Sequence, residues 1–191
     1  MSPHLRLGGR ATLPDGDDVI WSVADGRRGR RWRAETIHAG AIVSSLLLEL
    51  DGDGRPSRLE LATAAGLLTL HPESTGALHG NAVTPDGVRH LAFDWSEEHE
   101  LEIDGSVITR AATSNRLARA TPVGEGRSVP VVAVGLDLEV RGGERHYRRL
   151  DATTWRVEWA GGAELVAVDA RGLPIWPAAA GEWPLELDAW S

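Results

Sequence analysis

The sequence contains no cysteine, no lysine and no glutamine, so its twenty basic residues are all arginines. The absence of cysteine excludes disulfides, thiol nucleophiles and cysteine-ligated metals or clusters. The absence of lysine excludes Schiff-base enzymes, pyridoxal phosphate lysines and the phosphate-binding lysine of P-loops. The cation of any chemical site must therefore be arginine or protonated histidine, and arginine stays charged and does not easily serve as a base.

Long apolar runs are also missing from the 191 residues. No stretch approaches eighteen consecutive apolar residues, and residues 1–18 hold arginines without an apolar core, so we expect neither a membrane span nor a secretory signal. The formal net charge of −8 disfavours general binding of nucleic acid. These absences predict a cytoplasmic protein without integral membrane association.

Turn sequences dominate residues 1–30, which we therefore predict to be a loop-rich segment. From Arg31 onward, short runs alternate apolar and polar residues and end at Gly, Asp, Pro or Asn, the pattern of half-buried strands. The clearest runs are 46–50, 58–61, 66–71, 88–95, 101–104, 132–140, 155–159 and 163–169. Residues 110–120 could form one or two helical turns. The spacing of the runs predicts one all-β, mostly antiparallel domain over residues 31–191, either a sandwich or a barrel.

Motifs for metals, cofactors and nucleophiles are scarce. The seven histidines include no pair at the helical i, i+4 spacing of zinc proteins, although strands could bring His71, His79 and His90 together with Asp94. Scattered surface histidines are the simpler interpretation, so we predict no metal. The sequence has neither a Gly-x-Ser-x-Gly elbow nor a Gly-x-Gly-x-x-Gly loop, and we predict no cofactor.

Paired carboxylates are plentiful, with Glu100, Glu102 and Asp104 at alternate positions of one run. Carboxylates at i, i+2 share one strand face, and acid–base catalysis needs two such groups in different environments. A solvated sheet face is the commoner reason for alternating acids.

Five arginines crowd one short segment, at positions 27, 28, 30, 31 and 33. Such a cluster could bind an anion or an anionic lipid headgroup. A solvated or partly disordered loop is the competing interpretation. Only Trp32 lies near, so the segment lacks the interleaved aromatics of proteins that bind single-stranded nucleic acid.

Eight tryptophans stand against one tyrosine and one phenylalanine. Trp155 and Trp159 share a strand face, and Trp176 and Trp183 lie near prolines at the end of the chain. Core filling is the expected role of any single tryptophan. In a rolled or barrel-like sheet, however, two or more could line an interior cavity and stack on sugar rings or acyl chains.

Three segments carry a resemblance to a known family: Leu101 to Arg119, Arg145 to Val157 and Ala163 to Pro177, supported by the runs at 46–51 and 58–61. They resemble a bacterial family of glycolipid-binding proteins, of which this chain would be a divergent member. In the family, an acidic strand leads to a Thr/Asn turn with arginines, an Arg-Tyr-x-Arg-Leu strand follows, and an Asp-x-x-Gly-Leu hairpin closes the domain. The resemblance implies a single curved sheet rolled into a spiral β-roll with an internal pocket that binds lipid or glycolipid.

These observations support two main hypotheses for function. The first is a non-catalytic carrier or sensor of a lipid, glycolipid or other apolar small molecule, with ligand-binding residues Trp95, Arg110, Asn115, Arg116, Tyr147 and Trp155. The second is a small cofactor-independent enzyme (an isomerase, cyclase, dehydratase or hydrolase) acting on an apolar metabolite in the same cavity, with acid–base residues His90, Asp94, Glu102 and Asp104. A third interpretation is an interaction module with a filled core and an exposed apolar patch.

Overall fold

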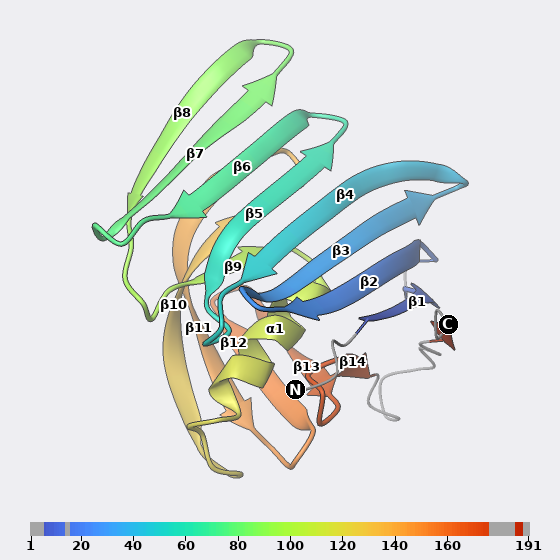
Figure 1. The fold of residues 1–191 in the computed structure, drawn as a ribbon, viewed down its shortest axis with the longest axis vertical. Coiled ribbons are helices and arrows are strands. Elements are labelled where there is room, and N and C mark those ends of the chain that lie inside the picture. The colour runs from blue at the N-terminus through green and yellow to red at the C-terminus, as the bar shows by residue number, and fades with distance from the viewer. Residues whose placement is uncertain (1–5, 14–15, 176–185, 189–191) are drawn as a thin grey trace. The chain divides into compact units, whose positions relative to one another are not determined.

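The computed structural model describes residues 6–13, 16–175 and 186–188, over which it contains fifteen strands and one helix (Figure 1). The predicted all-β, mostly antiparallel class is confirmed. Contacts between Cα atoms divide the chain into two compact units. The first unit comprises the described residues of 1–97, 135–139 and 184–191, and the second those of 98–134 and 140–183.

The first unit is built on a nine-stranded antiparallel sheet in the order β15-β1-β2-β3-β4-β5-β6-β7-β8. Its strands follow one another as hairpins, so sequence neighbours are also sheet neighbours, and β15 pairs with β1 at the end. The strands are β1 (Arg6–Thr12), β2 (Asp18–Gly26), β3 (Gly29–His38), β4 (Ala41–Leu50), β5 (Pro56–Thr63), β6 (Gly66–Pro72), β7 (Ala77–Thr84), β8 (Gly87–Asp94) and β15 (Glu186–Asp188).

One face of this sheet is apolar and buried over β2 to β6. Along these strands apolar and polar side chains alternate, and the pairing register puts the apolar ones of neighbouring strands opposite each other. Val23, Trp32, Leu48, Leu59 and Leu70 stand opposite one another on β2 to β6, and each is at most 2% exposed. The residues between them point to the other face, as the alternating burial along β2 and β4 shows. Side chains that would be isolated on single strands thus form one continuous row across five strands.

Strands β1 and β2 correct the prediction of a loop-rich segment over residues 1–30. In β2, Val19, Trp21 and Val23 are buried while Ile20 and Ser22 are exposed, which is the period-2 pattern of a strand. The turn residues in this region mark the ends of strands. Gly26 pairs with Gly29 across a two-residue hairpin turn.

The second unit is built on a six-stranded sheet in the order β14-β13-β12-β11-β10-β9, with one helix. Strands β9 and β10 run parallel, and α1 connects them as the crossover that parallel neighbours require. The other pairs are antiparallel. The elements are β9 (Glu100–Ile103), α1 (Val107–Leu117), β10 (Gly126–Val134), β11 (Val140–Arg149), β12 (Thr154–Trp159), β13 (Gly162–Val168) and β14 (Pro174–Ile175).

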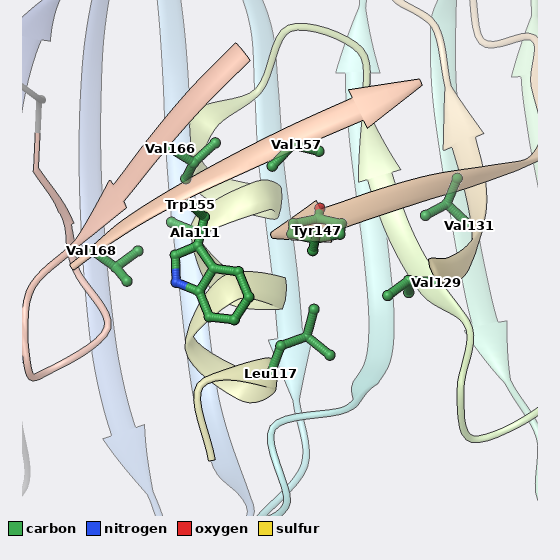
Figure 2. Close-up of a cluster of buried hydrophobic side chains, with 9 residues drawn as sticks. All are labelled: Ala111, Leu117, Val129, Val131, Tyr147, Trp155, Val157, Val166 and Val168. Carbon is green, nitrogen blue, oxygen red and sulfur yellow. The ribbon is translucent and has the colours of Figure 1, made fainter. Parts of the chain in front are cut away.

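The core of the second unit lies where α1 packs against its sheet (Figure 2). Tyr147 and Trp155 meet edge to face with ring centroids 6.4 Å apart. Around them, Ala111 and Leu117 of α1 join Val129, Val131, Val157, Val166 and Val168 of the sheet. The helix predicted within 110–120 is therefore present. It runs over Val107–Leu117, and residues 108–114 are buried.

The predicted strand over residues 132–140 is wrong, because a turn divides it. β10 ends at Val134, β11 begins at Val140, and these two residues pair. Leu138 adopts a positive φ of 63°, and its N–H donates to the carbonyl of Gly135. The alternation of Leu136 and Leu138 with acidic residues hid this turn, since the apolar pattern continues across it.

The described strands form two sheets rather than the single curved sheet that was expected. The division falls after β8, because β9 pairs with β10 and not with β8. One rolled domain over residues 31–191 with an internal pocket stays a prediction. Within the described residues, no helix is both long enough and apolar enough to cross a membrane.

Substitution of Gly80 by alanine tests the tight packing of the nine-stranded sheet. A Cβ at Gly80 would lie 2.2 Å from the carbonyl oxygen of Thr69 and 2.6 Å from Leu70 Cδ2. We expect Gly80→Ala to lower the free energy of unfolding by about 1–3 kcal/mol in urea titrations. Gly52→Ala is the control, because a Cβ at Gly52 would meet nothing within 4 Å. Equal stability of the two variants would contradict the packing described.

Candidate functional site

His90 and Asp94, the first pair predicted for acid–base chemistry, both lie exposed on β8 of the first unit. His90 Nδ1 is 2.6 Å from Oδ1 of Asn81 on the neighbouring strand. Both side chains are open to solvent, and His90 is engaged with Asn81 rather than with Asp94.

Glu102 and Asp104, the second predicted pair, lie in and after β9 of the second unit. Asp104 is half-buried and forms an ion pair with Arg141, a side chain that is itself exposed. Glu102 is different, because its side chain is only 2% exposed. A buried carboxylate is costly unless it is paired and hydrogen-bonded, so its partners decide what it can do.

Two arginines bind the same oxygen of Glu102. Arg110 of α1 donates to Glu102 Oε1 through Nε (3.3 Å) and Nη2 (3.1 Å). Arg145 of β11 donates to the same atom through Nε and Nη2, both at 3.1 Å. The side chains of Arg110 and Arg145 are 6% and 11% exposed. One carboxylate oxygen therefore holds two nearly buried guanidinium groups.

Glu164 and Trp159 complete this group. Glu164 of β13 forms an ion pair with Arg110, with Oε1 of Glu164 2.5 Å from Nη1 of Arg110. The Glu164 side chain is 34% exposed. Trp159, at the end of β12, is half-buried, and the guanidinium carbons of Arg110 and Arg145 lie 5.1 and 5.5 Å from the centroid of its ring. We call Glu102, Arg110, Arg145, Trp159 and Glu164 the Glu102 cluster.

Burial and charge shift several pKa values in and beside the Glu102 cluster. Burial acts to lower the pKa of Arg110, but Glu102 and Glu164 outweigh it and raise that pKa above its ordinary value. Burial raises the pKa of Glu164, against the lowering effect of Arg110. Burial also raises the pKa of Tyr147, helped by the charges of Glu102 and Glu100. Tyr147 therefore keeps its proton, and its side chain is hydrogen-bonded to Thr113.

Glu102 Oε2 is buried and has no hydrogen-bond partner in the described structure. All four arginine N–H contacts go to Oε1. An unpaired buried carboxylate oxygen is expensive, and such groups call for an unseen partner such as a ligand or an ordered water. The Glu102 cluster thus combines a free acceptor, two fixed cations and a tryptophan face.

Of the predicted ligand-binding residues, only Arg110 belongs to the Glu102 cluster. Arg116 forms an ion pair with the buried Glu100, and the Asn115 side chain packs so closely on Gly172 that a Cβ there would lie 2.3 Å from its Cγ. Tyr147 and Trp155 are core residues at 1% and 0% exposure. Trp95 lies half-buried in the first unit. Tyr147 and Trp155 are therefore core side chains, and Trp95 is in a different unit from Arg110.

Arg145, Trp159 and Glu164 were missed as site residues. Their meeting depends on the registers of β11, β12 and β13, which pair in sequence order. A signal was present for Trp159, which ends the strand face that holds the buried Trp155 and Val157. Arg145 gave no such signal, because it lies in a polar run of β11. Trp176 and Trp183 lie outside the described residues. Over the described part of the chain, no group of three or more His, Asp or Glu side chains could hold a metal ion.

Removing the charge of Glu102 tests whether it holds the two arginines. We expect Glu102→Gln to lower the free energy of unfolding by about 3–5 kcal/mol, because it leaves two buried guanidiniums without their shared anion. The matched control is Glu158→Gln, which breaks the exposed ion pair with Arg156 and should cost less than about 1 kcal/mol. The free energies of unfolding of both variants are measured in urea. Equal losses of stability would contradict the role of Glu102 in holding the two buried arginines.

The raised pKa of Glu164 predicts a pH dependence of stability. The unfolded chain loses this proton near the ordinary value of 4.5, whereas the folded chain loses it at higher pH. Between these pH values the folded state holds the extra proton, so the free energy of unfolding falls as pH rises. We expect the stability of the wild type relative to Glu164→Gln to fall with pH above 4.5. A relative stability that rose over this range in urea titrations would contradict the assignment.

Comparison with known proteins shows the fold alone. No family model matches the chain, and no curated protein matches it. Among solved structures, the chain is similar to a DUF1089 family protein from Pseudomonas aeruginosa, with a TM-score of 0.55 and 21% sequence identity. The match covers 88% of this chain and 87% of that protein. The chain therefore has a distant fold-level relationship to this DUF1089 family protein.

Proposed function

We propose that this protein binds a glycolipid or a similar sugar-bearing small molecule without catalysis, and that the Glu102 cluster receives the sugar headgroup. The observation that carries the proposal is Glu102 Oε2, a buried carboxylate oxygen without a partner beside a half-buried tryptophan. The resemblance of the sequence to glycolipid-binding proteins supports the same ligand class.

A sugar matches the three kinds of group in the cluster. Its hydroxyls can donate to the free oxygen of Glu102 and accept from guanidinium N–H groups. Its apolar C–H face can lie on the ring of Trp159, since tryptophan combines a large apolar surface with a polar edge. The two arginines flank that ring at 5.1 and 5.5 Å, so its position is fixed before a ligand arrives. A preorganised site loses less freedom on binding.

Binding is favoured over catalysis by how the carboxylates are used. Glu102 Oε1 accepts from two arginines, and Glu164 accepts from one. Asp104 is paired with Arg141, and His90 and Asp94 are exposed in the other unit. No observation brings two predicted acid–base residues together around one reacting atom, so we propose no reaction.

Calorimetric titration with octyl glucoside below its micellar concentration tests the proposal. We expect the wild type to bind this probe and to bind a sugar-free octyl poly(ethylene glycol) ether more weakly, because the glucoside carries several hydroxyl donors on a sugar ring and the ether has only its terminal hydroxyl. Trp159→Leu should weaken glucoside binding by about tenfold, equivalent to about 1.4 kcal/mol. Circular dichroism confirms that each variant is folded.

Trp95→Leu is the matched control, because Trp95 is also half-buried but lies in the first unit. It should leave glucoside binding unchanged. Equal binding of the two detergents, or a loss confined to Trp95→Leu, would overturn the assignment of the headgroup site to the Glu102 cluster.

A further inference from the structure

A hollow of about 890 Å³ in the first unit is lined by five arginines. We call it the arginine hollow, and its arginines are Arg6, Arg27, Arg28, Arg30 and Arg31. Its volume is within the range of small-molecule sites, roughly 300–1,000 Å³. The concentration of positive charge is notable because the chain as a whole has a net charge of −8.

The carboxylates that line the arginine hollow are already engaged. Asp25 forms two hydrogen bonds with Arg30, from Nε at 2.6 Å and from Nη2 at 2.9 Å. Glu49 lies 2.5 Å from Nη2 of Arg31. Asp51 Oδ1 accepts from the backbone N–H groups of residues 53 and 55, both at 2.9 Å, and so stabilises its own turn. Five arginines face three carboxylates, and the excess charge is positive.

Three arginines, Arg6, Arg27 and Arg28, are not paired with these carboxylates. Arg27 and Arg28 are both exposed, and neither forms a hydrogen bond or ion pair with any other described residue. They occupy the two-residue turn between β2 and β3, whose flanking residues Gly26 and Gly29 pair with each other. The two guanidiniums therefore extend from adjacent positions of one tight turn.

The backbone around this turn is held in place. Gly29 has a φ of +124°, and a Cβ there would lie 2.1 Å from the carbonyl oxygen of Leu50. Only glycine allows the backbone at the start of β3 to lie this close to the end of β4. Arg30 is fixed in turn, since its guanidinium carbon lies 5.9 Å from the centroid of the Trp32 ring and its side chain is 16% exposed. The backbone of the hairpin and the side chain of Arg30 are thus fixed parts of the arginine hollow.

We propose that the arginine hollow binds the phosphate ester group of a small molecule or a lipid headgroup, with Arg27 and Arg28 as its principal ligands. Guanidinium groups bind phosphate oxygens in pairs through charge-assisted hydrogen bonds. A long nucleic acid would meet the acidic remainder of the protein, whereas a small phosphate ester needs only the local excess of positive charge. This site is independent of the sugar site proposed in the second unit.

The test uses the full chain, soluble probes and vesicles. Pyrophosphate and glycerophosphate are titrated by calorimetry at low ionic strength, and vesicles of phosphatidylcholine with or without phosphatidic acid are tested by co-sedimentation. The double variant Arg27→Gln/Arg28→Gln should weaken binding by about tenfold or more. Arg127→Gln/Arg148→Gln is the matched control, since it removes the same charge from two exposed, unpaired arginines outside the hollow.

Each outcome decides the proposal. Binding of glycerophosphate, with or without pyrophosphate, that is lost only in Arg27→Gln/Arg28→Gln supports a free phosphate ester as the ligand. Binding confined to vesicles with phosphatidic acid, with the same variant pattern, supports a lipid headgroup. Wild-type protein that binds none of the probes, or equal losses in the two double variants, would overturn the proposal. Trp159→Leu should retain phosphate binding, so the two proposed sites fail or succeed separately.

Discussion

The second unit depends on how one buried carboxylate is neutralised. Glu102 lies on β9, and its Oε1 atom accepts from Arg110 of α1 and Arg145 of β11. Arg110 continues to Glu164 of β13, so a single connected set of charges joins one helix to three strands. Buried charges are costly when a partner is missing, so each element must take the position that brings its charge to Glu102. We infer that this pairing fixes the rotation of α1 on the sheet.

Because the chain has no lysine, arginine serves in two different roles. In the second unit, the planar guanidiniums of Arg110 and Arg145 are buried, share one oxygen and lie over a tryptophan ring. A single ammonium cannot make such forked contacts. In the first unit, Arg30 and Arg31 are matched by carboxylates, while Arg27 and Arg28 remain unpaired at the hairpin turn. The buried, paired guanidiniums of Arg110 and Arg145 hold elements of the second unit together. The exposed, unpaired guanidiniums of Arg27 and Arg28 leave a surface that is able to bind an anion.

Alternation of apolar and polar residues identified strands such as β4 and β5, which bury one face, and it failed where turn residues and strand residues share a pattern. Residues 1–30 were assigned to loops from their Gly and Asp content, yet Trp21 is buried by the sheet. The turn at Leu138 was hidden inside a continuous apolar alternation. In the site, Arg110 and Glu102 were identified separately, but their pairing was not. Their pairing joins α1 to β9, and Arg145 of β11 reaches the same carboxylate. The registers that bring Arg145 there are properties of the sheet and not of any local segment.

A crystal structure of the protein with octyl glucoside tests the Glu102 cluster most directly. We expect density for the sugar on the ring of Trp159, with a hydroxyl oxygen about 2.5–3.0 Å from Glu102 Oε2. That contact would give the unpaired buried oxygen its missing donor. A structure in which an ordered water donates to Glu102 Oε2 and the sugar binds elsewhere would contradict the assignment of the sugar site to the Glu102 cluster.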